Sequence, residues 1–290
     1  MVGTRPGAAG GRPPSEPPRR LPGVVVSIAS AVVAAARIGW STLPEAHALR
    51  TAVVRIVVVP VLTTAFYLAV SSGGGLRPVG LGDAVAAAVG AGSIAASVSV
   101  AEVLARDRHE GTLVFLVIAS RARVVTGLGR VVVVAGVGAL AAVVGLSLPL
   151  VVFGPPSDPA VWWGLALVVV TAAPASLGVG CVLGSVSLRL RDSLAPATVA
   201  EYALPLLCGV VVSVGAMPPV VGAAASALPL THVLEAGRSV IDDGLAFEAA
   251  GRVAVALALG LAWAVVGAAT WRRSERRARS TGGLDATGPG

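Results

Sequence analysis

Long runs of apolar residues alternate with short polar stretches along most of this chain. A run of about 20 apolar residues forms a helix long enough to cross the ~30 Å hydrocarbon core of a bilayer. The pattern therefore predicts an all-α integral membrane fold with six transmembrane helices. We place the crossings at about residues 51–70, 83–104, 130–153, 161–188, 194–214 and 252–271.

Two further apolar segments are too short to be counted as crossings. Residues 24–40 precede the first crossing and contain Arg37, which predicts an N-terminal interfacial helix, with an additional crossing as the alternative. Residues 215–251 separate the last two crossings and hold Pro218 and Pro229 before a polar stretch. We expect one or two short outer helices there, lying on the membrane face or dipping into it.

The densest internal group of charges lies between the second and third crossings, over residues 102–130. It contains Glu102, Arg106, Asp107, Arg108, His109, Glu110, Arg121, Arg123 and Arg130. Because charged groups are costly in hydrocarbon, we expect this stretch at a membrane surface. The apolar run 112–120 between its charged ends predicts a short helix along that surface, where a cytoplasmic partner contacts the membrane part.

The composition agrees with a membrane protein. Only 13% of the 290 residues are charged and 55% are hydrophobic, whereas a soluble domain has about 25% charged residues. Residues 1–23 are rich in Pro, Gly and Arg, and residues 276–290 are rich in Gly. We therefore predict disordered cytoplasmic tails on both sides of one transmembrane domain, residues 24–275.

The placement of arginine predicts the orientation in the membrane. All 22 basic residues are arginine, and three of them, Arg77, Arg238 and Arg252, fall in predicted outer segments. The other 19 lie on the inner side or at its interface. By the positive-inside rule, this distribution predicts a multi-pass plasma-membrane protein with both termini in the cytoplasm.

The residues also exclude several activities. A P-loop ATPase needs a lysine in its phosphate-binding loop, and this chain has no lysine, so any ATP hydrolysis would occur on another polypeptide. Cys181 and Cys208 lie in predicted spans, where we expect small buried side chains rather than a disulfide or metal ligands. We find no catalytic acidic pair, Ser/His/Asp set or metal constellation in the sequence. The basic stretch 271–280 suits anionic membrane lipids rather than nucleic acid.

Three features inside the predicted helices are candidates for a role. Glu201 lies about two turns into the fifth crossing, where it contacts a substrate, pairs with an arginine such as Arg55, or is reached by water from the inner interface. Glu235 and Arg238 are three residues apart and share a helix face, which predicts a structural salt bridge. Gly180 and Gly184 form a GxxxG pattern that permits close helix packing, although chance explains it equally well in so Gly-rich a chain.

Two regions resemble a known family. The first is Glu110-Gly-Thr-Leu113, then an apolar stretch, Ser120-Arg121 and Gly129-Arg130; the second is Leu204-Pro-Leu-Leu207, the Pro218–Pro219 step and the run ALPLTHVLEAGR at 227–238. In this order they resemble the permeases of the ABC-2 type exporter family, which includes daunorubicin-resistance and lipo-oligosaccharide exporters. The resemblance covers about residues 40–275, with Ala119 and Arg130 where proline and lysine are common in the family.

The resemblance implies a permease subunit that is not an enzyme and holds no cofactor, with ATP and Mg²⁺ on a separate ABC ATPase subunit. A second copy or a paralogue would complete an export pathway for a lipophilic or amphipathic substrate, such as a drug, an antibiotic or a lipid-linked molecule. In this setting we assign three sets of candidate residues. They are ATPase contacts at Arg106, Arg108, Glu110, Gly111, Thr112 and Arg121, translocation candidates Glu201 and Arg55, and an outer gate with Pro218, Pro229, Glu235 and Arg238.

Two other interpretations fit the pattern less well. The stretch 102–130 could be only a solvated loop that membrane insertion requires. The chain could also be a stand-alone secondary transporter or another polytopic membrane protein. A secondary transporter needs charged residues at the membrane midplane or inverted repeats, and the predicted spans hold few such residues and show no internal symmetry.

Overall fold

A computed structural model describes residues 28–41, 48–76, 78–109, 122–244 and 247–281. These parts of the chain contain helices and no strand, which confirms the predicted all-α fold. In chain order the helices are α1 (Ile28–Ser41), α2 (Leu49–Val53), the π-helical η2 (Val54–Val58), α3 (Val59–Ser71), α4 (Leu81–His109), α6 (Ala122–Phe153), α7 (Pro159–Ser187), α8 (Ala195–Leu207), the 3-10 helix η3 (Val214–Ala216), α9 (Pro219–Ser226), α10 (Pro229–Asp243) and α11 (Phe247–Thr281).

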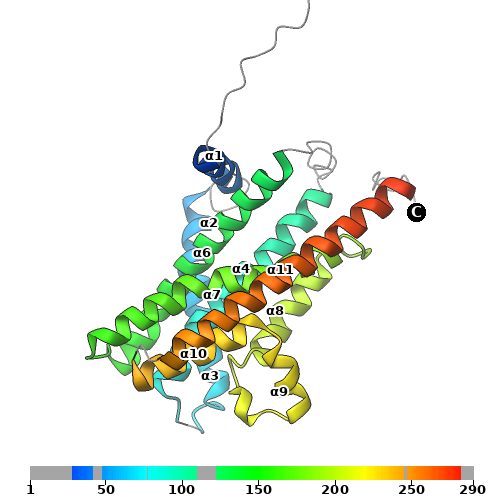
Figure 1. The fold of residues 1–290 in the computed structure, drawn as a ribbon. Coiled ribbons are helices and arrows are strands. Elements are labelled where there is room, and N and C mark those ends of the chain that lie inside the picture. The colour runs from blue at the N-terminus through cyan, green and yellow to red at the C-terminus, as the bar shows by residue number, and fades with distance from the viewer. Residues whose placement is uncertain (1–27, 42–47, 77, 110–121, 245–246, 282–290) are drawn as a thin grey trace, which may run out of the picture.

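The long helices form a bundle of membrane spans (Figure 1). Among the described residues, five stretches are long and apolar enough to cross a bilayer: Leu49–Ser71, Leu81–Arg108, Gly129–Phe153, Pro159–Ser187 and Phe247–Arg273. The count rises to six if α9 and α10, which meet at an angle of 96°, are taken as one broken span. The predicted integral membrane fold is therefore confirmed, and four of the predicted crossings match single helices closely.

The predicted fifth crossing, residues 194–214, differs from the structure because its helix α8 ends at Leu207. Gly209 adopts a left-handed conformation (φ +81°), and the Val210 N–H donates to the Pro205 carbonyl at 3.1 Å. This is the hydrogen bond that closes a helix with a glycine just beyond its end. Thirteen residues give about 20 Å of helix, less than the bilayer core, and the chain then continues into the outer helices α9 and α10.

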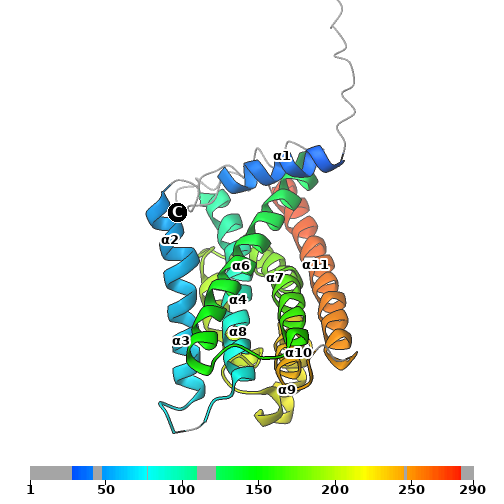
Figure 2. The ribbon, with the colours of Figure 1, turned by 90° about the vertical axis from the view of Figure 1, so that its left-hand side faces the viewer.

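Helix α1 lies across one end of the bundle rather than alongside the spans (Figure 2). It packs on the start of α6, where a Cβ atom on Gly39 would lie 3.0 Å from the Arg130 Cα. This arrangement agrees with the predicted interfacial helix and not with an extra crossing. The same end of the bundle carries the end of α4, the start of α6 and the end of α11 (Figures 1 and 2). We call it the inner end, and the opposite end, with α9 and α10, the outer end.

The last helix extends further than expected. Helix α11 ends at Thr281, so the first residues of the tail that we predicted from residue 276 continue the helix.

Helix α4 forms the centre of the bundle and packs against α7 through small residues. A Cβ atom on Gly180 would lie 2.5 Å from the Ser97 carbonyl oxygen, and one on Gly184 would lie 2.4 Å from the Leu104 Cδ1. The GxxxG pattern therefore marks a real close contact, in which the backbones approach because no side chain intervenes. On another face of α7, a Cβ atom on Gly178 would lie 2.2 Å from the Gly260 carbonyl oxygen of α11.

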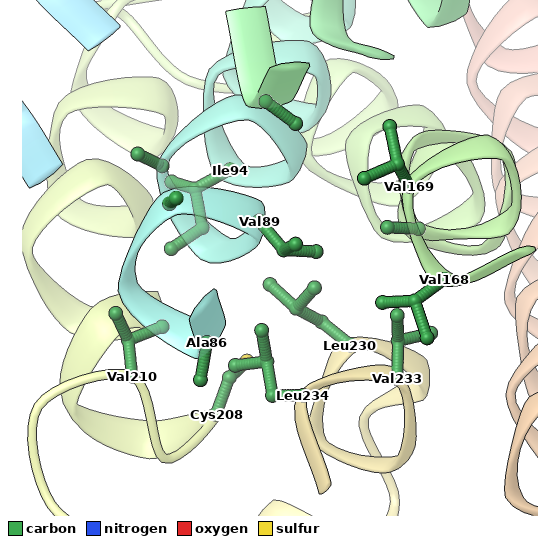
Figure 3. Packing of buried hydrophobic residues seen from close by; sticks show 14 of the residues in the cluster. Ala86, Val89, Ile94, Val168, Val169, Cys208, Val210, Leu230, Val233 and Leu234 are labelled. Atoms are coloured by element: carbon green, nitrogen blue, oxygen red, sulfur yellow. The ribbon is translucent and has the colours of Figure 1, made fainter. Parts of the chain in front are cut away.

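The largest buried cluster joins α4, α7, α8 and α10 (Figure 3). Val89 of α4, Val168 of α7 and Leu234 of α10 are at most 1% exposed and contribute to its interior. Cys208 lies in the same cluster as a buried free thiol, and Cys181 is a free thiol that is only partly buried. Since lipid tails are as apolar as these side chains, the dispersion energy of close packing holds the spans together.

Candidate functional site

A groove lies between the first span and helices α4, α6 and α8, with an empty volume of about 920 Å³ that includes its open side. We call it the central groove. Its lining is mostly apolar, with a few polar and charged side chains. The lining residues are Arg55, Val59, Pro60, Thr63, Tyr67, Ala91, Ile94, Ala95, Ala96, Val98, Ser99, Glu102, Val134, Val137, Gly138, Ala141 and Glu201.

An ion pair lies in the groove between Arg55 of the first span and Glu102 of α4, with the Arg55 Nη2 3.5 Å from the Glu102 Oε2. Arg55 belongs to the π-helical segment η2, and Pro60 follows it in the next turn. Proline cannot donate a backbone hydrogen bond and its ring displaces the preceding turn, so we attribute the wider π turns to Pro60. Such a local widening is frequent at functional sites, and here it carries Arg55, the arginine among the described lining residues.

Both predicted translocation residues, Arg55 and Glu201, line this groove. The ion pair described for Arg55 is nevertheless with Glu102, which we had placed in the surface charge cluster. Glu201 is exposed and forms no hydrogen bond or ion pair with the residues that the structure describes. Glu102 precedes the end of α4 by seven residues and Glu201 follows the start of α8 by six. At 1.5 Å per residue, both carboxylates lie about 10 Å inside the inner end.

The inner end is held together by arginine side chains from different helices. Arg130 of α6 pairs with Asp107 of α4, which is 7% exposed. Arg108 of α4 donates to the carbonyl oxygens of Ser187 (3.1 Å) and Leu190 (2.7 Å), just at the end of α7. Ser187 is the last residue of α7, and its carbonyl has no partner within the helix; a cation there also complements the helix dipole.

Arg189, which follows α7, donates to the Thr270 carbonyl of α11 at 3.2 Å. Together these contacts connect α4, α6, α7 and α11 near the end of α4 and the start of α6. We call them the inner brace. Of the predicted ATPase contacts, Arg106 is exposed on α4 and Arg108 belongs to the brace. Glu110, Gly111, Thr112 and Arg121 lie outside the described residues.

At the outer end, α10 is connected to α4 and α11. The Arg238 Nε donates to the Asp83 Oδ1 of α4 at 2.9 Å, and its Nη2 donates to the Gly209 carbonyl at 2.6 Å. Arg252 of α11 pairs with Glu235 at 2.5 Å and with Glu248 at 2.6 Å. The predicted salt bridge between Glu235 and Arg238 is therefore wrong, because each side chain meets a partner on another helix.

The two predicted gate prolines occupy helix starts. Pro229 is the first residue of α10, and Pro218 directly precedes Pro219, the first residue of α9. Proline suits the first helical position because its fixed φ angle fits and its missing N–H has no partner there anyway. The 96° bend between the two helices falls between these positions.

Sequence reasoning missed three residues that the structure brings into these contacts: Asp83, Glu102 and Arg252 as ion-pair partners. Glu102 was assigned to the surface charge cluster and Arg252 to an outer segment. Glu102 and Glu201 lie at similar distances from the helix ends nearest the inner end, and this could have predicted that both line one groove. The partner of Arg238 is 155 residues away in the chain, and no local spacing rule finds such a pair. No group of three or more potential metal ligands occurs among the described residues.

The fold and the central groove define a polytopic helical membrane protein built around an open cleft. Residues 44–241 match the family model described as ABC-2 type transporter. This match covers more than half of the chain and includes every residue of the groove. The chain therefore belongs to the ABC-2 type transporter family. No curated protein and no solved structure matches it.

Proposed function

We propose that this chain is the permease subunit of an ATP-driven exporter that moves a lipophilic or amphipathic substrate out across the plasma membrane. The family match supports a permease that works with a separate ABC ATPase. Export direction, substrate type and a second permease copy are our proposals. The arginine distribution supports an orientation with the inner end in the cytoplasm.

The observation that carries this proposal is the inner brace. It connects four long helices, α4, α6, α7 and α11, near the end of the bundle where α4 ends and α6 begins, the two helices that flank residues 110–121 in the chain. A partner that pushes on this stretch would therefore move the helix ends together rather than bend one of them. Two of these helices, α4 and α6, also line the central groove, so the same movement changes the shape of the groove.

The test is to purify the full chain from its native membranes by an affinity tag and to identify what comes with it. We expect an ABC ATPase carrying a phosphate-binding loop. The complex should hydrolyse ATP, and the chain alone should not. Replacement of the catalytic carboxylate in the ATPase should abolish both hydrolysis and export. Normal export by cells that lack the ATPase would refute the proposal.

A further inference from the structure

The charges in the central groove are not balanced. Arg55 and Glu102 form an ion pair, whereas Glu201 has no ion-pair partner among the described residues. Among the described residues that line the groove, one side chain is positive and two are negative, so these residues carry an excess negative charge when both carboxylates are ionised. The rest of the lining is apolar apart from Thr63, Tyr67 and Ser99.

An apolar surrounding strengthens the attraction between this excess negative charge and a cation. Between two unit charges 4 Å apart the attraction is about 1 kcal/mol in water and about 4 kcal/mol at the effective dielectric constant near a protein surface. A carboxylate that faces hydrocarbon is also unfavourable until a cation accompanies it. A ligand with a positive group would remove this cost, whereas a ligand with a negative group would add repulsion from both Glu102 and Glu201.

The shape and the remaining lining favour a bulky apolar ligand. The groove is open on one side, so a ligand larger than its enclosed part can lie in it, with its apolar body against the Val, Ala and Ile side chains. Tyr67 adds an aromatic ring to the wall, and aromatic faces attract cations.

From these observations we propose that the central groove binds lipophilic cations, with Glu201 as the residue that determines the preference for positive charge. This inference rests on the proposed function, since it assigns a substrate class to the same permease. Glu201 acts by direct charge pairing with the ligand, and the Val, Ala and Ile side chains of α4 and α6 hold its apolar body. The pair Arg55–Glu102 stays neutral as a unit.

The test compares two probes of nearly equal size and opposite charge, tetraphenylphosphonium and tetraphenylborate. Their saturable binding is measured to the full chain in lipid nanodiscs, with empty nanodiscs as the baseline for partition into lipid. We expect saturable binding of the cation only. Glu201→Gln should weaken it about tenfold, which corresponds to about 1.4 kcal/mol, and Glu201→Arg should abolish it.

The control variant is Glu248→Gln, which removes one carboxylate at the outer end of α11 and should leave the cation affinity unchanged. Thr63→Trp, which fills the groove without changing its charge, should abolish binding as well. Size-exclusion chromatography and tryptophan fluorescence establish that each variant is folded. If Glu201→Gln does not fold, two other variants decide the question. Thr63→Trp should abolish binding, and Glu201→Asp should keep the affinity within about threefold.

Three results would overturn the inference. They are equal binding of both probes, unchanged cation binding by a folded Glu201→Gln protein, and no saturable binding, which is expected if a second copy or a lipid tail fills the groove. None of them bears on the proposed function, because the assay needs no ATPase. Conversely, if the chain binds the cation but purification from its native membranes yields no ABC ATPase, this site stands and the ATP-driven permease is refuted.

Discussion

The second span, α4, and the first span, Leu49–Ser71, have comparable hydropathy but opposite surroundings. In the most apolar stretch of each, 89% of the residues are buried in α4 and 17% in the first span. Alanine, glycine and serine dominate α4 and allow neighbouring backbones to approach, whereas the first span presents valine, leucine and phenylalanine outward. We conclude that α4 is the scaffold, and that the first span is a more loosely attached wall of the central groove.

The largest effect should come from Gly180→Ala, which tests the close packing of α7 on α4. The added Cβ atom would lie 2.5 Å from a backbone carbonyl oxygen, so the two helices must separate. We expect a loss of up to about 3 kcal/mol of stability, which is typical of an overpacked core, seen as a reduced yield and melting temperature in detergent. The matched control is Gly136→Ala in α6, where nothing lies within 4 Å. It should not lower stability, and it could raise stability by up to about 1 kcal/mol, because alanine is the better helix former.

Next in size is Arg238→Ala in α10, which removes the contact with Asp83 at the outer end of α4. It removes hydrogen bonds to Asp83 and to the Gly209 carbonyl, and bonds to charged groups contribute about 1.5–3 kcal/mol. We expect the melting temperature to fall by about 5 °C. Arg238→Lys keeps the charge but cannot reach both partners as the planar guanidinium does. Its melting temperature should therefore lie between those of the wild type and Arg238→Ala. An unchanged value for Arg238→Ala would show that α10 is held by other contacts.

A smaller change in stability is expected for Asp107→Asn at the inner end of α4, because asparagine can still accept one hydrogen bond from Arg130. We predict about 1 kcal/mol. The more sensitive readout is the amount of substrate exported per ATP hydrolysed by the complex, which should fall because the inner brace is weakened. Exchange of the two side chains, Asp107→Arg with Arg130→Asp, should restore part of the substrate export per ATP hydrolysed. If export per ATP does not change, the brace is only structural.

The smallest effect is expected on the first span. Val57 is 43% exposed there, whereas Val89 of α4 is fully buried. Val57→Ala should change stability by less than about 0.5 kcal/mol. Val89→Ala should cost about 1–2 kcal/mol, because the missing methyl groups leave a gap in which packing contacts are lost. Thermal unfolding of both variants under one condition measures this difference. Similar losses in the two proteins would contradict the division into a scaffold and a loosely attached wall.

The predictability of this fold from sequence depended on the range of the interactions. The spans could be predicted because length and apolar content alone decide whether a helix crosses a bilayer. The GxxxG pattern of Gly180 was visible in the sequence, but the face it meets was not. The early end of α8 had a local signal, Gly209, which lay inside an apolar run and was taken as part of a helix.

The candidate site was less predictable than the fold. Arg55 and Glu201 were identified because ionisable residues inside spans are rare, and both line one groove. A pairing between them was one of the alternatives for Glu201, and the ion pair that the structure describes for Arg55 is with Glu102 instead. The partners of Glu235 and Arg238 also come from other helices. Such pairings depend on how the helices pack, and a single sequence shows only the positions on each helix.

The central claim is that ATP hydrolysis by a partner, and not an ion gradient, drives transport through this chain. The direct measurement is the accumulation of a fluorescent lipophilic dye in inside-out membrane vesicles that contain the chain with or without its ATPase. The account predicts that accumulation requires ATP and an active ATPase, and that it persists when a protonophore collapses the proton gradient. Accumulation driven by a proton gradient, without ATP and in vesicles that lack the ATPase, would contradict it.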